Sequence, residues 1–175
     1  MARKARIMSI DVPYHITSRG NNKQPVFLSD IDKREYLSYL RSYCIQFQLD
    51  ILAYCLMTNH IHLIVKGHLP DSLEFAIGRT NGRYAQYFNK RYSRNGHLWQ
   101  GRFFSEGIDE ERLTAVICYI ERNPARAEMV KNAWDFPWSS ASAHIGGTDH
   151  SKLLDLSAWF TDRNAEDWRI VLGAD

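Results

Sequence analysis

Asn59-His60-Ile61-His62-Leu63-Ile64-Val65 is the stretch around which the rest of the sequence can be arranged. Successive side chains of a strand point to opposite faces, so His60 and His62 share one face and the apolar residues between them fill the other. Two imidazoles on one face can bind a divalent ion if a third ligand comes from elsewhere. The alternative is a pair of half-buried, hydrogen-bonded histidines. The stretch therefore predicts a strand with one core face and one face that can carry chemistry.

Length and composition indicate a single soluble domain. The chain has 175 residues and a mass of 20.4 kDa, which is enough for one substantial core. No apolar run approaches the roughly 18 residues needed to span a bilayer. The basic N-terminus is not followed by the apolar segment of a secretory signal, and the three cysteines are scattered along the chain. We therefore expect a cytoplasmic protein with reduced thiols.

The periodicity of apolar residues predicts an α+β fold. Strands are expected over 12–19, 49–57, 59–67 and 98–108, and helices over 30–47, 72–92 and 109–122. The third helix should end at Asn123, because Pro124 disfavours helical geometry in the residue before it, and a new helix can begin at Pro124. This order is the split βαβ arrangement of ferredoxin-like domains, an antiparallel sheet with helices on one face. The other face would carry His15, Thr17, Arg19, His60, His62 and Lys66.

Tyr119 and Asn123 lie four residues apart and so on the same face of the third helix. Opposite two histidines, Tyr119 could attack a phosphodiester as a phenolate, and Asn123 could offer its amide oxygen as the third metal ligand. A phenol is almost fully protonated at neutral pH, so a bound metal ion or His15 would have to help remove its proton. The alternatives are that Tyr119 lies at the edge of the core, that Asn123 caps a following helix, and that His15 is hydrogen-bonded within the sheet.

Four blocks of sequence carry a family resemblance: 14–20 (YHITSRG), 57–63 (MTNHIHL), 98–102 (LWQGR) and 119–124 (YIERNP). In this order they resemble the single-tyrosine HUH transposases, and in particular the REP-associated tyrosine transposases, over about residues 12–146. The resemblance implies a ferredoxin-like domain that binds single-stranded or hairpin DNA and nicks it with Mg²⁺ or Mn²⁺. Its tyrosine becomes joined to the 5′-phosphate. The resemblance assigns His60 and His62 as metal ligands and Tyr119 as the nucleophile, and it places Asn123 where many relatives have the longer Gln.

The resemblance also predicts how the chain is organised. It implies a transposase-like catalytic domain over 1–147, of which 1–11 is a basic arm, followed by an acidic C-terminal tail over 148–175 with helical structure. The protein should act at the bacterial nucleoid. A monomer with the whole site in one chain is favoured, although some relatives are dimers. Because the tail is acidic, it could lie against the DNA-binding surface as a mimic of DNA.

The DNA-binding surface is expected over residues 79–102, a stretch with six basic residues, no acidic one and several aromatic residues. Basic side chains neutralise phosphates and aromatic rings stack on unpaired bases. The basic arm could order on nucleic acid. The alternative is a solvated helix face with its aromatic residues in the core. The predicted DNA contacts are Arg3, Lys4, Arg6, Arg19, Arg79, Arg83, Lys90, Arg91, Arg94, Trp99, Gln100 and Arg102.

Two other functions stay open from the sequence. The segments 15–17 (HIT) and 60–62 (HIH) could be paired motifs of a metal-independent phosphoesterase, with His15 and the two strand histidines as general acid and base. Such an enzyme would keep its turnover in EDTA and would not need Tyr119. A ferredoxin-like sheet could also bind nucleic acid without catalysis, but this one has histidines where stacking aromatic residues would be expected.

Overall fold

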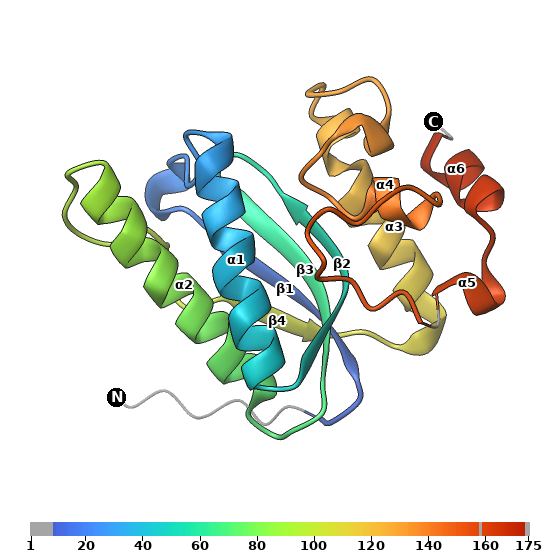
Figure 1. The fold of residues 1–175 in the computed structure, drawn as a ribbon, viewed down its shortest axis with the longest axis horizontal. Coiled ribbons are helices and arrows are strands. Elements are labelled where there is room, and N and C mark those ends of the chain that lie inside the picture. The colour runs from blue at the N-terminus through green and yellow to red at the C-terminus, as the bar shows by residue number, and fades with distance from the viewer. Residues whose placement is uncertain (1–8, 158, 174–175) are drawn as a thin grey trace.

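The structure is a computed structural model that describes residues 9–157 and 159–173. A four-stranded sheet lies at the centre, its strands antiparallel and in the order β2-β3-β1-β4 (Figure 1). The strands are β1 (Pro13–Arg19), β2 (Leu49–Leu56), β3 (His60–Gly67) and β4 (Phe104–Gly107). The helices are α1 (Asp30–Gln46), α2 (Ser72–Arg91), α3 (Glu110–Arg126), α4 (Ala141–His144), α5 (Trp159–Asp162) and α6 (Ala165–Gly173), with short 3-10 turns at Asn21–Lys23 and Ala133–Asp135. This architecture confirms the predicted α+β class.

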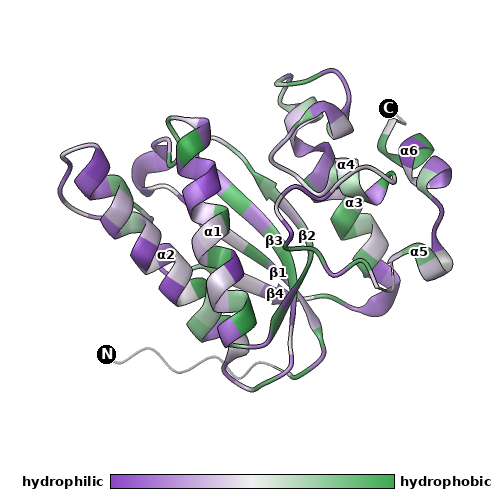
Figure 2. Ribbon diagram, viewed as in Figure 1, coloured by the Kyte–Doolittle hydropathy of each residue, from purple (hydrophilic) through white to green (hydrophobic). Residues whose placement is uncertain are grey.

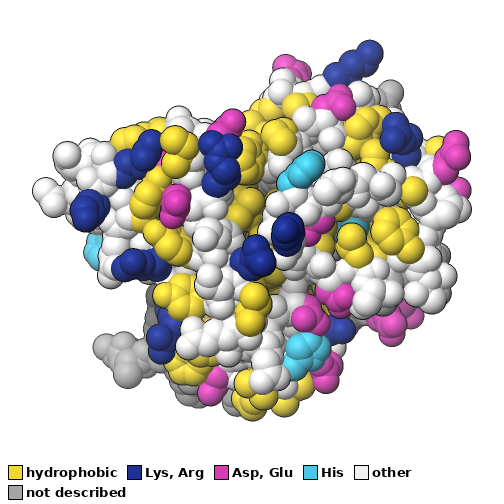
Figure 3. Space-filling model, viewed as in Figure 1, with side chains coloured by type: hydrophobic (Ala, Val, Ile, Leu, Met, Phe, Trp, Pro, Cys, Tyr) yellow, Lys and Arg dark blue, Asp and Glu magenta, His cyan; other side chains and the backbone are white. Residues whose placement is uncertain are grey.

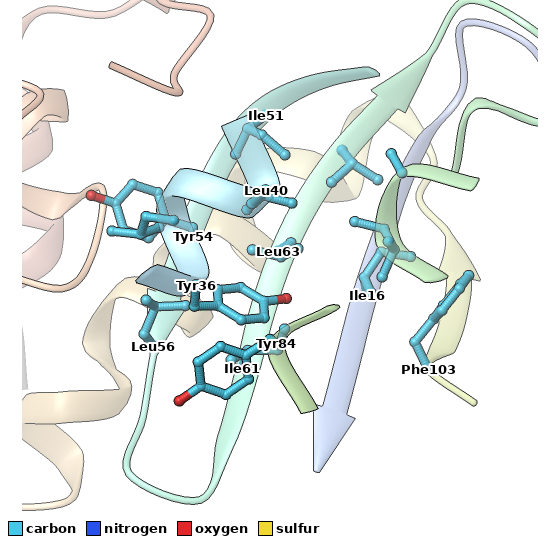
Figure 4. Packing of buried hydrophobic residues seen from close by; sticks show 14 of the residues in the cluster. Ile16, Tyr36, Leu40, Ile51, Tyr54, Leu56, Ile61, Leu63, Tyr84 and Phe103 are labelled. Carbon is cyan, nitrogen blue, oxygen red and sulfur yellow. The ribbon is translucent and has the colours of Figure 1, made fainter. Parts of the chain in front are cut away.

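The two faces of the sheet are covered differently. On one face, α1 and α2 lie side by side, and Tyr36 and Tyr84 pack against the strand residue Leu63 in the main core (Figure 4). Hydrophilic and hydrophobic residues alternate along both helices, as expected for helices with one buried side (Figure 2). On the other face, Ile117 of α3 joins Ile64 of β3 in a second cluster. Because α3 covers only part of this face, the rest stays open for the histidines of β3.

Local signals in the sequence explain why α1 forms where it does. Ser29 caps the helix by accepting a hydrogen bond from Asp32 N, while Asp32 Oδ2 accepts one from Ser29 N at 2.8 Å. Asp32 is fully buried and also accepts hydrogen bonds from the Tyr87 and Tyr92 hydroxyls, so the same cap ties α1 to the end of α2. Among the described residues, no helix is both long and apolar enough to cross a membrane.

Two predicted boundaries are wrong. The fourth strand does not begin at Leu98. Residues 98–103 are irregular, with Leu98 buried and the Trp99 indole donating to Asn81 O, because side chains from this segment fill the main core. The third helix does not stop at Asn123 but runs through Pro124 to Arg126. Pro124 lies in the last turn, where its missing N–H removes a single helical hydrogen bond, and burial of its ring favours the helical path.

The C-terminal segment does not lie on the basic surface of α2. Trp159, Trp168 and Leu172 are buried in the second cluster with Ile117 and Ile120 of α3. In Figure 1, α5 and α6 stand at the opposite end of the molecule from α2. The hypothesis that this segment mimics DNA on that surface is therefore wrong. Residues 159–172 complete the packing of α3.

Candidate active site

His60 and His62 lie on the open face of β3, as the alternation of the strand predicts. Their ring centroids are 4.9 Å apart and the rings are nearly perpendicular, at 88°. Ile61, between them, points into the main core and is fully buried. His62 is only 7% exposed, whereas His60 is half-buried. The strand therefore presents two adjacent imidazoles at different depths.

The neighbouring strand β1 fixes the orientation of His62. Thr17 is paired directly with His62 in the sheet, and its Oγ1 lies 3.3 Å from His62 Nδ1. The Nε2 atom of His15 lies closer to His62 Nδ1, at 2.9 Å, and the two rings are stacked. On the other histidine, Nδ1 lies 2.7 Å from Asn59 Oδ1. Since both Nδ1 atoms are engaged, Nε2 is the nitrogen that each strand histidine has left for a ligand.

Burial keeps these imidazoles neutral. It lowers the pKa of His62 to about 3, with smaller contributions from the nearby His60, His15 and Arg19. Burial also lowers the pKa of His60, and Arg19 acts in the same direction. The pKa of His15 is lowered by burial as well, against an opposing effect of Glu106. Neutral imidazoles are the form that binds metal ions, so the electrostatics favour ligation over charge repulsion.

These pKa shifts predict how stability depends on pH in the metal-free protein. Below the ordinary histidine pKa of 6.5 the unfolded chain binds protons at His62 that the folded chain does not, so stability falls as pH falls from 6.5 toward 3. From pH 7 to pH 5 this residue alone should remove about 2 kcal/mol. Urea unfolding in EDTA at both pH values measures the loss. His62→Gln should reduce it, and an equal loss in this variant would contradict the assignment.

Tyr119 stands on α3 beside the histidines. Its ring centroid is 6.3 Å from that of His62, and the side chain is 46% exposed. The Arg126 guanidinium lies over the Tyr119 ring, 5.3 Å from the ring centroid. A hollow of about 310 Å³ opens next to the tyrosine. It is lined by His15, Glu106, Gly107, Ile108, Arg112, Ala115, Val116 and Tyr119. A substrate can therefore reach the hydroxyl, which is not enclosed in the interior.

A buried carboxylate anchors the helix that carries Tyr119. Glu121 is fully buried and accepts hydrogen bonds from His144 Nδ1 at 2.6 Å, from Trp168 Nε1 at 2.9 Å and from the Ser140 hydroxyl. Ser140 in turn accepts a hydrogen bond from Tyr54 N of β2 at 3.1 Å. One side chain on α3 is thus tied to α4, to α6 and to an edge of the sheet. These bonds fix how α3 lies over the histidines.

Glu121→Ala is expected to lower the free energy of unfolding by about 3 kcal/mol or more, because it leaves three buried donors unpaired. The exposed Glu111, in the first turn of α3, provides the control. Glu111→Ala should cost less than about 1 kcal/mol. Chemical denaturation of both variants measures the difference, and losses of similar size would show that the buried network does not hold α3.

The residues at this site can accommodate a divalent ion. Among the described residues, no three His, Cys, Asp or Glu side chains could hold a metal ion, so a third protein ligand would have to be of another type. Asn123 lies one turn from Tyr119, and its Nδ2 is buried without a hydrogen-bond partner. A side-chain amide can turn over and present its oxygen instead. Two neutral imidazoles and one amide oxygen leave positions for water and a phosphate oxygen, which fits a divalent ion with oxygen ligands.

Most of the chain is similar in sequence to a known protein family. Residues 9–123 match the sequence profile of a family described as IS200-like transposases. The matched segment is more than half of the chain and contains His60, His62 and Tyr119. The chain belongs to the IS200-like transposase family.

Two known proteins are similar to this chain. A protein of Haemophilus influenzae that carries the name of a REP-associated tyrosine transposase is 28% identical over 120 residues, which cover 61% of this chain. The matched part spans 66% of that relative's length. A solved REP-associated tyrosine transposase bound to a REP hairpin has a TM-score of 0.66 at 17% identity, covering 83% of this chain and 86% of that chain. At that identity the likeness concerns the fold. The family predicted from the four sequence blocks is thus confirmed.

Three of the predicted DNA contacts of this IS200-like transposase lie together next to the histidines. Arg19 is paired with His60 in the sheet, and Gln100 N donates a hydrogen bond to Arg19 O at 2.9 Å. A hollow of about 460 Å³ opens beside this segment and the start of β4. It is lined by Thr17, Arg19, Gln100, Gly101, Arg102 and Phe104. Arg19, Gln100 and Arg102 therefore line one hollow beside the histidines.

Other predicted contacts of the transposase lie away from the histidines. Figure 3 shows Lys and Arg side chains over α1 and α2, on the face of the sheet opposite to β3's histidines. There, Arg79 lies 5.2 Å from the ring centroid of Phe47, and Arg83 lies 5.8 Å from that of Tyr39. The structure does not bring these residues to the site. The same holds for Lys90 at the end of α2, for Arg91, which pairs with Asp32 at 3.5 Å, and for Arg94, which bonds to Gln24.

Trp99, another predicted DNA contact, packs against the main core. The Trp99 ring lies against Tyr36 and Tyr84 in the main core, and its indole nitrogen is bonded to the backbone, so it packs within the transposase fold. Arg3, Lys4 and Arg6 lie outside the described residues.

Sequence reasoning did not single out Glu106 and Arg112, which line the hollow beside Tyr119. Glu106 lies on β4 directly opposite His15, and Arg112 lies on the first turns of α3. Within the described part of the transposase neither side chain makes an ion pair or a hydrogen bond. The pairing register of β4 with β1 would have revealed Glu106, but a short edge strand has too few residues for its register to be read from sequence.

Proposed function

We propose that this IS200-like transposase nicks and rejoins single-stranded or hairpin DNA through a covalent 5′-phosphotyrosine at Tyr119, in a reaction that requires Mg²⁺ or Mn²⁺. The observation that carries the proposal is the exposed phenol of Tyr119 within 6.3 Å, ring to ring, of a buried neutral histidine. A DNA substrate is supported by the solved relative, which is bound to a REP hairpin. Because His60, His62 and Tyr119 come from one chain, the proposal needs only a monomer.

The reaction is a phosphoryl transfer to the phenol. The Tyr119 oxygen loses its proton and forms a bond to the scissile phosphorus, while the bond from phosphorus to the 3′-oxygen breaks and that oxygen takes up a proton. The product keeps the energy of the broken bond in a phosphotyrosine ester. A 3′-hydroxyl can later attack the ester, release Tyr119 and restore the strand. Cutting and joining are therefore one reversible reaction that needs no external energy.

The remaining side chains bind and orient the substrate. His60 and His62 would hold the divalent ion through Nε2, with Asn123 as the third protein ligand. When bound, the ion supplies Lewis-acid polarisation of the scissile phosphate. Arg126, over the Tyr119 ring, is positioned to neutralise phosphate charge beside the nucleophile. His15 holds the His62 ring through the 2.9 Å contact to Nδ1.

One incubation separates the proposal from a metal-independent phosphoesterase. The protein is mixed with end-labelled hairpin DNA that carries single-stranded tails, in Mn²⁺ or in EDTA, and run on a denaturing gel. We expect a labelled band at the size of the protein–DNA adduct in Mn²⁺ and none in EDTA. Cleavage that continues in EDTA without an adduct would support the phosphoesterase. Binding without any cleavage would support a non-catalytic DNA-binding module.

A further inference from the structure

An exposed phenylalanine stands on the open face of the sheet, beside the candidate active site. Phe104 begins β4 and is paired directly with Thr17 of β1. Residues directly opposite each other in an antiparallel pair project from the same face, so Phe104 shares the face of Thr17, whose Oγ1 is 3.3 Å from His62 Nδ1. The side chain of Phe104 is 57% exposed. An aromatic ring is thus presented to solvent in line with the proposed metal ligands.

Packing does not account for this ring. The preceding residue, Phe103, is buried in the main core on the other side of the chain. Within the described residues, Phe104 belongs to none of the hydrophobic clusters and contacts no other aromatic ring. It also lies on an edge strand, where an exposed apolar side chain favours unwanted pairing with other chains. A large ring kept exposed here suggests a binding role more than a structural one.

The charges around Phe104 indicate what binds. Arg19, Gln100 and Arg102 line the same hollow of about 460 Å³ as Phe104. Both arginines are exposed, and in the part of the chain that the structure describes neither guanidinium group makes an ion pair or a hydrogen bond. None of the described residues that line this hollow is acidic. A flat apolar surface that shares a hollow with two unpaired guanidinium groups matches an unpaired nucleobase and its neighbouring phosphates.

We propose that Phe104, Arg19 and Arg102 form a subsite for one unpaired nucleotide next to the scissile phosphate, with the base stacked on the Phe104 ring. The inference rests on the proposed function, because it assumes that single-stranded DNA enters the site. Neighbouring strands are about 4.8 Å apart, so Phe104 lies two strands, or roughly 10 Å, from His62 along the row His62–Thr17–Phe104. A base at Phe104 therefore belongs to a nucleotide close to the cut, and stacking would hold the strand in register for attack by Tyr119.

The test measures binding without cleavage. The Tyr119→Phe protein in EDTA is titrated into fluorescent hairpin DNA with single-stranded tails, alone or combined with a second substitution. Phe104→Ala should weaken binding by roughly 5- to 150-fold, the range for loss of one base stacked on an aromatic ring. Phe104→Trp should restore it. Phe160→Ala removes another exposed ring, 44% exposed and on α5, and should leave affinity unchanged.

An abasic site moved along the tails then locates the stacked base. With Phe104 present, one position should cause a loss of affinity that matches the loss from Phe104→Ala, and combining the two changes should cost little more than either. Unchanged binding in Phe104→Ala would overturn the subsite, as would losses that simply add at every position. A change of oligomeric state in Phe104→Ala without a change in its DNA affinity would also overturn the subsite. If the protein with Phe104 intact does not bind the DNA, the proposed function itself fails.

Discussion

Tyr119→Phe is expected to abolish the protein–DNA adduct and to lower strand cleavage by about 10³-fold or more, since it removes the attacking oxygen and little else. The side chain is 46% exposed and its hydroxyl makes no hydrogen bond within the described structure, so folding should be unaffected. DNA binding should also persist, because the aromatic ring stays. Cleavage is measured on a denaturing gel and binding by fluorescence titration, both in Mn²⁺.

Tyr43→Phe is the matched control for this prediction. Tyr43 is a half-buried tyrosine of α1 that stacks on Phe47 and whose hydroxyl likewise has no partner among the described residues. Its substitution should leave adduct formation unchanged. Adduct formation by Tyr119→Phe at the normal rate would remove Tyr119 from the reaction. Equal losses in both variants would point to a general effect of losing a hydroxyl.

His62→Gln is expected to weaken Mn²⁺ binding by more than about 100-fold, since loss of outer-shell partners alone typically costs 10- to 100-fold. Cleavage at a fixed Mn²⁺ concentration should fall accordingly and recover in part at higher concentrations. Glutamine keeps polar atoms near His15 and Thr17, so the sheet should stay intact. Isothermal titration with Mn²⁺ measures the affinity without reference to catalysis.

His97→Ala provides the control for metal binding. His97 is exposed in the loop after α2, and only its backbone oxygen is bonded, to Gln24. This variant should bind Mn²⁺ normally. If His62→Gln binds Mn²⁺ as tightly as the unchanged protein, the ion is held elsewhere and the proposed role of the β3 histidines is wrong.

The central elements of the fold follow from periodicity in the sequence. The alternation of residues 59–65 places the two histidines on one face, and the structure has them there with Ile61 and Leu63 in the core. The capping residues around Ser29 place the start of α1 correctly. Such features depend on neighbouring residues only, so a sequence displays them directly.

The errors arise where long-range packing overrides a local signal. Pro124 is a local stop signal, but burial of its ring in the last turn of α3 carries the helix past it. The residues at 98–103 have strand-like composition, yet Leu98 and Trp99 turn toward the main core and leave β4 only four residues. The charge of the acidic C-terminal segment predicts that it lies on a basic surface, but burial of Trp159 and Trp168 decides where it packs.

Some residues of the site can likewise be predicted from the sequence, and others depend on long-range strand pairing. The family motifs identify His60, His62 and Tyr119, and the fold brings these three side chains together. Charge density predicts a DNA-binding surface on α2, but charge density does not tell which face of the sheet a helix covers. Phe104 and Glu106 lie on the same face as the histidines because β4 pairs with β1, which joins residues about ninety positions apart.

The most direct test is to locate the covalent bond. An adduct formed in Mn²⁺ is digested with protease and nuclease, and the modified peptide is identified by mass spectrometry. We expect the peptide that contains Tyr119 to carry a nucleotide through its 5′-phosphate. A nucleotide on a different residue, or attachment through a 3′-phosphate, would contradict the proposed chemistry.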